Sequence, residues 1–166
     1  MPGCVAEVFA TRDATARETA LHDRVVGAGL PWQRVEDDAL ASLAETVHPQ
    51  GIVAVCRFVD RPLPDVLDRG EPRLVAVCAD VRDPGNAGTV IRCADAAGAD
   101  AVVLAGHSVD PYNPKTVRAT VGSLFHLPVS LVEDPAAAVA TLRARSRSNS
   151  TLSCSPPTVS CVPIPE

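Results

Sequence analysis

A short turn and the helix expected after it carry residues suited to binding a phosphate group. The turn covers residues 83–88, with the sequence DPGNAG, and we expect the helix to run from about residue 89 to residue 97. A junction between a strand and a helix offers unpaired backbone N–H groups and the positive end of the helix dipole to an anion. Arg92 on that helix either pairs with Asp95 or binds a phosphate, and the residues alone leave both interpretations open. The spacing matches neither GxGxxG nor GxxxxGK[ST], so it supports neither a dinucleotide-binding fold nor a P-loop.

A second segment, residues 110–128, combines a stiff turn with a short cationic helix. Its prolines and asparagine favour a turn, followed by a helix that we expect from about residue 114 to residue 121. Lys115 and Arg118 are three residues apart, so they would form a cationic edge on that helix. Gly122 and Ser123 follow the helix, where backbone groups are free to contact a ligand.

Composition limits the class of protein. The chain has 166 residues, a formal net charge of −5 and a pI near 5.3, which argues against nonspecific binding of nucleic acid through bulk charge. The six cysteines form no CxxC pair and no histidine cluster joins them, so we expect no metal site. No apolar run has the length of a membrane span and the first residues lack the pattern of a signal peptide, so we expect a cytoplasmic protein.

The first 59 residues predict a small α/β layer. Apolar runs at residues 5–11, 32–35 and 51–59 have the length of strands, and the segments between them predict helices. Residues 60–73 contain three prolines and several charges, a pattern that predicts a linker.

Residues 74–145 predict a second α/β domain. The apolar runs at residues 74–81 and 100–106 flank the helix that carries Arg92, so we expect two parallel strands in a βαβ unit with a right-handed crossover. A further strand is expected near residues 127–132, followed by another helix.

The composition changes at residues 146–166. Six serines and four prolines occur there, whereas the preceding 145 residues contain four serines. Because no helical or strand period continues into this tail, we expect it to be disordered or not the native continuation, as after a frameshift.

The two polar segments together resemble motifs 1 and 2 of the SpoU/TrmH-type RNA ribose methyltransferases of the SPOUT class. The first reads DPGNAGTVIRCADAAGAD and the second reads DPYNPKTVRATVGSLFHLPV. The stretch HPQGIVAVCRF also resembles the end of the small L30e-like substrate-binding domain that precedes the catalytic domain in many members. The resemblance covers about residues 5–143 and implies a parallel-sheet α/β methyltransferase domain with a C-terminal trefoil knot, used as a homodimer.

The resemblance also implies transfer of a methyl group from S-adenosylmethionine to a ribose 2′-hydroxyl in rRNA or tRNA. Asn86 and Arg92 match the asparagine and the catalytic arginine of motif 1. An arginine suits either a bidentate clamp on a substrate phosphate or, with the help of that phosphate, the role of base. We expect the cofactor pocket to include Gly122, Ser123 and Leu127. We expect RNA to contact Arg82, Lys115 and Arg118, and we expect no membrane contact.

Motif 3 of the family, a Gly-Glu-Gly stretch followed by Ile-Pro and Ser-Leu-Asn, is absent from the sequence. In the family this motif forms much of the cofactor pocket and threads the knot. We therefore expect a chain truncated before motif 3, with weak or no binding of S-adenosylmethionine and impaired activity. Two alternatives stay open: a non-catalytic RNA-binding or dimerisation remnant of the family, and a small phosphate- or nucleotide-binding α/β protein unrelated to RNA.

Overall fold

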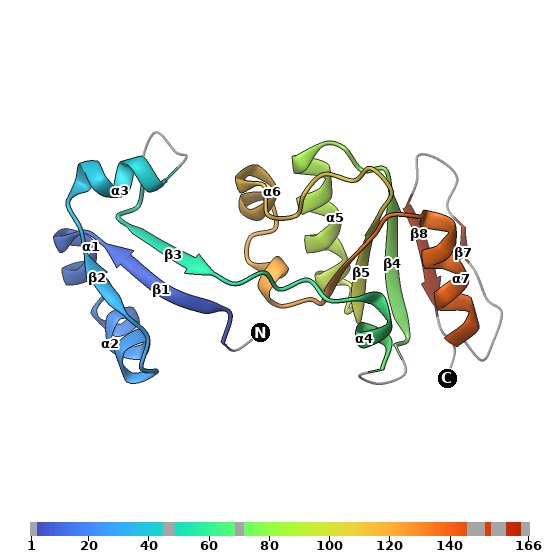
Figure 1. Cartoon of the computed structure of the whole chain (residues 1–166), viewed down its shortest axis with the longest axis horizontal. Coiled ribbons are helices and arrows are strands. Elements are labelled where there is room, and N and C mark those ends of the chain that lie inside the picture. Colours follow the sequence, from blue (N-terminus) through green and yellow to red (C-terminus); the bar gives the residue numbers. More distant parts are fainter. Residues whose placement is uncertain (1–2, 45–48, 69–71, 146–151, 154–158, 164–166) are drawn as a thin grey trace. The chain divides into compact units, whose positions relative to one another are not determined.

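The computed structural model describes residues 3–44, 49–68, 72–145, 152–153 and 159–163. The chain divides into two compact units, Met1–Phe58 and Val59–Glu166 (Figure 1). Among the described residues, no helix combines the length and the apolar character needed to cross a lipid bilayer.

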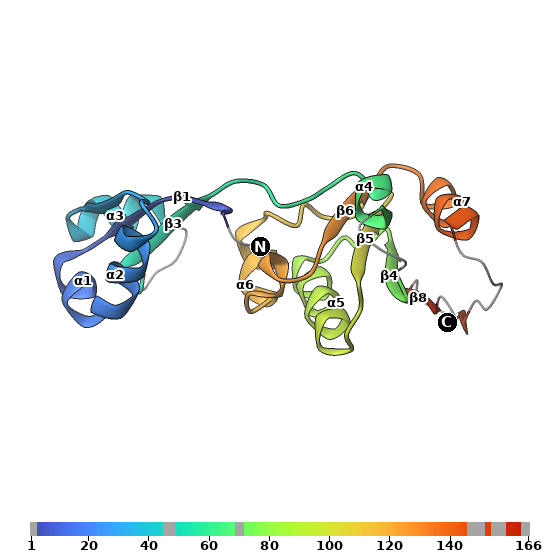
Figure 2. The same cartoon turned by 90° about the horizontal axis from the view of Figure 1, so that it is seen from below.

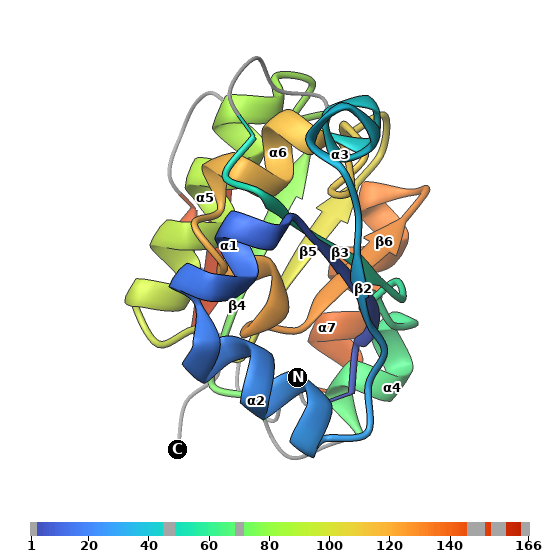
Figure 3. The ribbon, with the colours of Figure 1, turned by 90° about the vertical axis from the view of Figure 1, so that its left-hand side faces the viewer.

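Unit 1 is a three-stranded sheet with helices between its strands. Strand β1 (Val5–Ala10) pairs in parallel with β2 (Trp32–Arg34) and antiparallel with β3 (Ile52–Cys56), in the order β2-β1-β3. Helices α1 (Arg12–Arg17) and α2 (Thr19–Gly27) follow β1 and lie on one side of the sheet, and α3 (Asp37–Leu43) follows β2 (Figure 3). This is the predicted order of strands and helices, except that a single expected helix is divided at Glu18 into α1 and α2.

The buried core of unit 1 is small. Its fully packed apolar side chains are Val8, Ala10, Ala14 and Leu40. Thr11 is buried beside them and fixes the start of α1, because its side chain accepts a hydrogen bond from the backbone N–H of Ala14.

Unit 2 contains a five-stranded sheet and four α-helices among its described residues. The strands are β4 (Leu74–Ala79), β5 (Ala101–Ala105), β6 (Val129–Val132), β7 (Leu152–Ser153) and β8 (Val159–Pro163). The helices are α4 (Leu63–Leu67), α5 (Pro84–Ala96), α6 (Pro114–Ala119) and α7 (Pro135–Arg145), with a short 3-10 helix η1 (Ser123–Phe125) after α6.

The strand order in unit 2 is β6-β5-β4-β8-β7, and β4, β5 and β6 are parallel. Helix α5 lies on one face of the sheet and α4 and α7 lie on the other (Figure 2). Every side chain of β5 is buried, as expected for a parallel strand covered on both faces. The predicted parallel βαβ arrangement of β4, α5 and β5 is therefore confirmed.

Two sequence-based expectations for unit 2 differ from the structure. The stretch at residues 60–73, expected to be a linker, contains α4, whose Leu63, Val66 and Leu67 are buried in the same core as β4, β5 and α7. Within residues 146–166, the described strands differ from the expectation of disorder, because β8 pairs antiparallel with β4 and β7 pairs with β8. That this tail is not the native continuation stays a prediction. The other residues of that tail lie outside the described part of the chain.

Candidate functional site

Helix α5 begins five residues earlier than the sequence analysis predicts. Asp83 is its N-cap, and the Asp83 side chain accepts a hydrogen bond from the backbone N–H of Asn86 at 2.8 Å. Pro84 occupies the first helical position, which suits its fixed φ and its missing N–H. The predicted turn at residues 83–88 is therefore the first turn of the helix, and the expected helix start at Thr89 is wrong. Two glycines and an asparagine, all poor helix formers, hid this start.

The longer helix changes the geometry between Asn86 and Arg92. The two residues are six positions apart on one helix, so they are separated by about 9 Å along its axis and by roughly 120° around it. Both side chains are exposed. A ligand that contacts both must therefore reach across part of the helix surface.

Arg92 is not paired with Asp95, although both lie on α5. Nδ1 of His126 lies 2.6 Å from Oδ1 of Asp95 instead. Hydrogen bonds from Ser123 and then from His126 hold the pKa of the Asp95 carboxyl below its ordinary value. Within the described ranges no carboxylate lies in ion-pair distance of Arg92. Arg92 therefore does not form the ion pair with Asp95, and its guanidinium is open to an external anion such as a phosphate.

Helix α6 packs directly against the first turns of α5. A Cβ atom at Gly88 would lie 2.4 Å from the Cβ of Ala119 and 2.8 Å from the carbonyl oxygen of Thr116. Only a residue without a side chain permits this approach. The contact brings the two predicted motifs side by side. Gly88 of motif 1 therefore allows α5 and α6 to pack closely.

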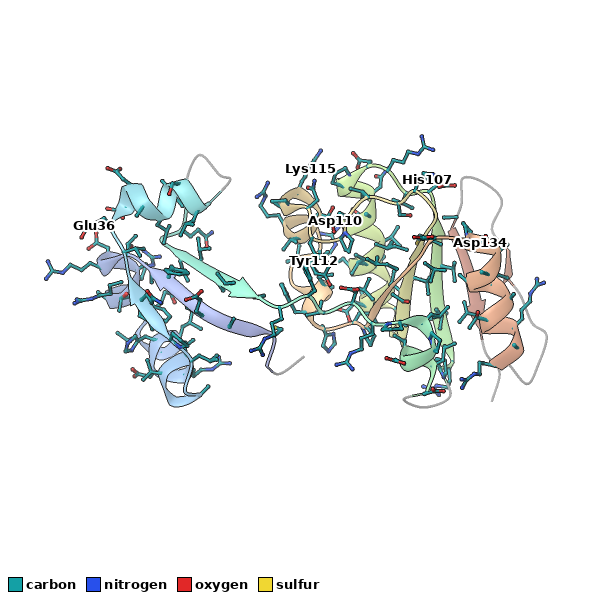
Figure 4. All side chains as sticks on the ribbon, in the orientation of Figure 1. Glu36, His107, Asp110, Tyr112, Lys115 and Asp134 are labelled. Atoms are coloured by element: carbon teal, nitrogen blue, oxygen red, sulfur yellow. The ribbon has the colours of Figure 1, made fainter. Side chains whose placement is uncertain are left out.

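The predicted RNA-binding residues lie on the exposed surface around this contact. Lys115 projects from α6 into solvent (Figure 4), and Arg118 is exposed one turn later. Arg82 is exposed immediately before the N-cap of α5. None of these three cations has an ion-pair partner in the described part of the chain. Their role in binding RNA stays a prediction.

The chain turns sharply where α6 ends. Val121 has a φ of 51° and its side chain is exposed, and Gly122 follows with a φ of 96°. A positive φ is a backbone outlier for a β-branched residue, and such outliers concentrate where other contacts hold the chain in place. Here the contacts come from η1, because Ser123 is buried and hydrogen-bonds Asp95.

The three predicted cofactor-binding residues do not by themselves form a pocket. Leu127 is 3% exposed and Ser123 is 8% exposed, so both side chains are committed to the interior. Two hollows lined by described residues of unit 2 lie elsewhere, one over β4 and α5 and one after β5 and β6. A molecule of cofactor size could therefore contact Gly122, which is exposed, and backbone atoms of these three residues. The assignment of these three residues to the cofactor pocket stays a prediction.

Tyr112, in the turn before α6, is a residue whose importance the sequence analysis missed. Its hydroxyl oxygen accepts hydrogen bonds from the backbone N–H groups of Val59 and Asp60, both at 2.7 Å, and donates to Oδ1 of Asp60 at 2.5 Å. Burial, and then the hydrogen bond to Asp60, raise the pKa of Tyr112 to about 12. The hydroxyl therefore anchors the first residues of unit 2 to the turn that leads into α6.

The described residues offer no set of side chains arranged to bind a metal ion. Across the described residues, no group of three or more His, Cys, Asp or Glu side chains could hold an ion.

Two family models match the sequence that builds these elements. The model of the SpoU rRNA Methylase family matches residues 73–160, which contain α5, α6 and their motifs. The chain belongs to this family. The model named RNA 2'-O ribose methyltransferase substrate binding matches residues 2–62.

Relatives of this SpoU-family chain include ribosomal RNA methyltransferases. The 23S rRNA (guanosine(2553)-2'-O)-methyltransferase RlmP of Bacillus subtilis is 40% identical over 128 residues, which are 77% of this chain and 47% of that protein. The 23S rRNA (uridine(2479)-2'-O)-methyltransferase of Streptomyces viridochromogenes is 42% identical over 112 residues, 65% of this chain and 38% of that protein. The chain spans about half the length, or less, of these curated relatives.

Solved structures of the family share the fold. An rRNA methyltransferase from Sinorhizobium meliloti superposes with a TM-score of 0.70 at 29% identity, over 87% of this chain and 53% of that one. The SpoU methyltransferase AviRb from Streptomyces viridochromogenes, in complex with AdoMet, gives a TM-score of 0.66 at 31% identity, over 85% and 51%. These matches confirm the predicted family and the α/β fold class. They exclude the alternative of a small phosphate-binding protein unrelated to RNA methyltransferases.

Proposed function

We propose that this protein takes part in S-adenosylmethionine-dependent methylation of a ribose 2′-hydroxyl in ribosomal RNA. The observation that carries the proposal is the exposed guanidinium of Arg92, which has no carboxylate partner among the described residues and stands on α5 beside α6. The relatives that methylate 23S rRNA support the RNA substrate, and the AdoMet-bound structure of AviRb supports the methyl donor.

Arg92 acts on the substrate RNA in this proposal. A ribose 2′-hydroxyl is a weak nucleophile until its proton is removed or its developing negative charge is stabilised. A guanidinium can hold a phosphate through two parallel N–H···O bonds, which places the neighbouring hydroxyl and offsets that charge. S-adenosylmethionine supplies the methyl group. Asn86, at the first turn of α5, offers an amide that can donate to and accept from the same nucleotide.

Arg82, Lys115 and Arg118 hold the RNA backbone around this point. Each is a solvent-exposed cation: Lys115 and Arg118 lie on α6, and Arg82 immediately precedes the N-cap of α5, the helix that Gly88 brings into contact with α6. The chain is acidic overall, so binding rests on these local charges and falls with added salt. We further propose that the protein works in the cytoplasm as a homodimer, with tRNA as the alternative substrate.

Transfer of tritium from labelled S-adenosylmethionine to ribosomal RNA transcripts tests the proposal. At saturating S-adenosylmethionine, tritium should enter the RNA slowly. After alkaline hydrolysis the label should remain in alkali-resistant dinucleotides, since a 2′-O-methyl group blocks cleavage at that ribose. Arg92→Ala should abolish incorporation, and Arg92→Lys should restore little because a lysine lacks the planar fork. Arg143→Ala, which removes an exposed arginine from α7, is the matched control and should leave the rate unchanged. Full activity of Arg92→Ala would overturn the proposal.

A second function is favoured by the packing of the predicted cofactor residues. Because Ser123 and Leu127 are buried, the chain can bind RNA through its cations without holding the methyl donor. In that case wild-type protein binds ribosomal RNA with a steep salt dependence and incorporates no tritium, and calorimetry detects no binding of S-adenosylmethionine.

A further inference from the structure

Unit 1 contains a polar hollow that the proposed chemistry at Arg92 does not use. Its volume is about 520 Å³, and residues 11–13 and 34–37 line it. Resting on the proposed function, we propose that this strand-end hollow binds one unstacked nucleotide of the substrate RNA, through its phosphate and through the amino group of its base.

The hollow lies where two parallel strands end side by side. Ala10 of β1 is the register partner of Arg34 of β2, and the backbone N–H of Val35 donates to the carbonyl oxygen of Ala10 at 3.0 Å. Each strand then leads into a helix, so two polar connections leave the sheet at the same edge. Ligands of α/β proteins bind at the carboxyl ends of parallel strands. Glu36 marks this end of the unit in Figure 4.

The floor of the hollow is held firmly. The backbone N–H of Thr11 donates to the carbonyl oxygen of Gly51 at 2.9 Å, and the Thr15 hydroxyl donates to the carbonyl oxygen of Thr11 at 2.8 Å. A Cβ at Gly51 would lie 2.8 Å from the Cβ of Ala14, so the residue before β3 and helix α1 are in close contact. A site whose backbone is fixed in advance loses less entropy when a ligand binds.

The charges of the hollow select a ligand with two kinds of group. Arg12 and Arg34 are exposed and have no ion-pair partner in the described ranges, although three carboxylates line the same hollow. The carboxylates of Asp13, Glu36 and Asp37 would repel a simple anion, and the two arginines would repel a simple cation. A nucleotide satisfies both sets, because its phosphate accepts from a guanidinium and an exocyclic amino group donates to a carboxylate.

Size and access favour an unstacked nucleotide of single-stranded RNA. A hollow of this volume lies within the range of small-ligand pockets, roughly 300 to 1,000 Å³. Bases in loops and bulges can turn outward and present their Watson–Crick edge, whereas bases in an RNA duplex cannot. Arginine planes also stack on exposed bases. Among bases, cytosine carries the amino group that uracil of the same ring size lacks, so the carboxylates favour cytosine over uracil.

Fluorescence anisotropy with short oligocytidine and oligouridine RNAs tests the inference on the full 166-residue chain. Wild type should bind oligocytidine roughly tenfold more tightly than oligouridine, the discrimination of one good base contact. Arg12→Ala and Arg34→Ala should each weaken both complexes by roughly tenfold. They should also reduce the slope of log affinity against log salt by about 0.7 for each lost phosphate contact. Glu36→Gln combined with Asp37→Asn should remove the preference for cytosine.

Arg24→Ala is the matched control, because Arg24 is exposed on α2 outside the hollow. If Arg34→Ala binds both RNAs as Arg24→Ala does, the inference is wrong while the proposed function stands. If wild type binds neither RNA and transfers no methyl group to ribosomal RNA, the proposed function fails as well. A free amino acid that protects the hollow arginines from chemical modification, where cytidine monophosphate does not, would also overturn the nucleotide assignment.

Discussion

Helix α5 and the segment from α6 to η1 carry the two motifs, and different forces hold them in place. The inward side of α5 is apolar, and most of its buried residues have small side chains or none: they are Ala87, Gly88, Ile91 and Ala94. The inward side of α6 is polar, since its fully buried side chain is Thr116, and Thr120 follows it at the C-cap. The chain around α6 is fixed on one side by the hydrogen bonds that the Tyr112 hydroxyl accepts from the backbone N–H groups of Val59 and Asp60. After α6 it is fixed by the hydrogen bond from Ser123 to the Asp95 carboxylate.

This difference shows what each motif residue contributes. On α5, volume is the constraint, so a substitution is harmful when it adds atoms at the contact with α6. Around α6, hydrogen bonding and backbone conformation are the constraints, so a substitution is harmful when it removes a polar group or restricts φ. The same residue type then has two uses: Gly88 provides space, and Gly122 provides a positive φ.

Gly88→Val should have the largest effect on stability. Its side chain would overlap the Cβ of Ala119 and the backbone of α6, which cannot rotate away as a flexible side chain would. We expect the free energy of unfolding to fall by about 3 kcal/mol or more. Urea denaturation followed by circular dichroism measures this, because the single tryptophan, Trp32, lies in unit 1 and does not report on unit 2.

Thr116→Val is the matched control at the same contact. The hydroxyl of Thr116 is buried and has no hydrogen-bond partner among the described residues, so an isosteric methyl group removes no bond. We expect its free energy of unfolding to stay within about 0.5 kcal/mol of wild type, or to rise. Equal losses in the two variants would show that the contact is not limited by volume.

Tyr112→Phe should have the next largest effect. The substitution keeps the ring but leaves the backbone N–H groups of Val59 and Asp60 without the oxygen that accepts from both. We expect the free energy of unfolding to fall by about 2 kcal/mol, the cost of unmade hydrogen bonds at partly buried donors. Thr141→Val, which removes a hydroxyl bonded to a helix carbonyl in α7, is the control and should change stability little.

The raised pKa of Tyr112 adds a pH test of the same bonds. Its folded pKa of about 12 lies above the ordinary value of 10.0 because burial and the bond to Asp60 favour the protonated phenol. This contribution to stability is therefore complete below pH 10.0 and disappears as the pH rises toward 12. Wild type should lose more stability than Tyr112→Phe in that interval. Tyr112 is the only tyrosine, so its phenolate absorbance reports this group alone.

The sequence predicted the elements that local patterns encode. Continuous apolar runs identified β4 and β5, because strands buried on both faces leave no polar positions. The spacing of Leu63, Val66 and Leu67 also encodes the inward side of α4, but the surrounding prolines and charges favoured a linker. The start of α5 was misplaced although Asp83 and Pro84 form a recognised helix start.

The contacts that position the site could not be predicted in this way. The bond between Tyr112 and Asp60 joins residues 52 positions apart, and that between His126 and Asp95 spans 31 positions. No hydrophobic period or turn signal refers to partners at such separations, since the fold alone brings them together. The resemblance to the family could name Arg92, but only the structure shows that Asp95 is engaged elsewhere.

Gly122→Ala should have a smaller effect than Tyr112→Phe, and for a reason opposite to that at Gly88. In the part of the chain that the structure describes, no atom lies within 4 Å of a Cβ built at Gly122, so space is free. The φ of 96° is the obstacle, and we expect a loss of about 1 kcal/mol in the free energy of unfolding. Gly122→Asn should cost less than Gly122→Ala, because asparagine adopts positive φ more readily. The reverse order would indicate a steric limit as at Gly88.

Asp95→Asn should have the smallest effect and should appear mainly in acid. The imidazole of His126 is 81% exposed, so solvent screens its attraction to the carboxylate. Hydrogen bonds from Ser123 and His126 lower the folded pKa of Asp95 below the ordinary 3.8. Their contribution is therefore present above that value and is lost as the pH falls through the folded pKa.

Denaturation at a series of acidic pH values measures the effect. Wild type should lose stability more steeply than Asp95→Asn below the ordinary pKa of an aspartate, and the two should run closely parallel at higher pH. Asp23→Asn removes a similar Asp–His contact from α2, where the aspartate is 80% exposed, and serves as the control. A larger loss from Asp95→Asn than from Gly122→Ala would mean that the carboxylate, not the backbone turn, fixes η1 against α5. The cationic surface beside Arg92 would then depend on a titrating group, and RNA binding would weaken in acid together with stability.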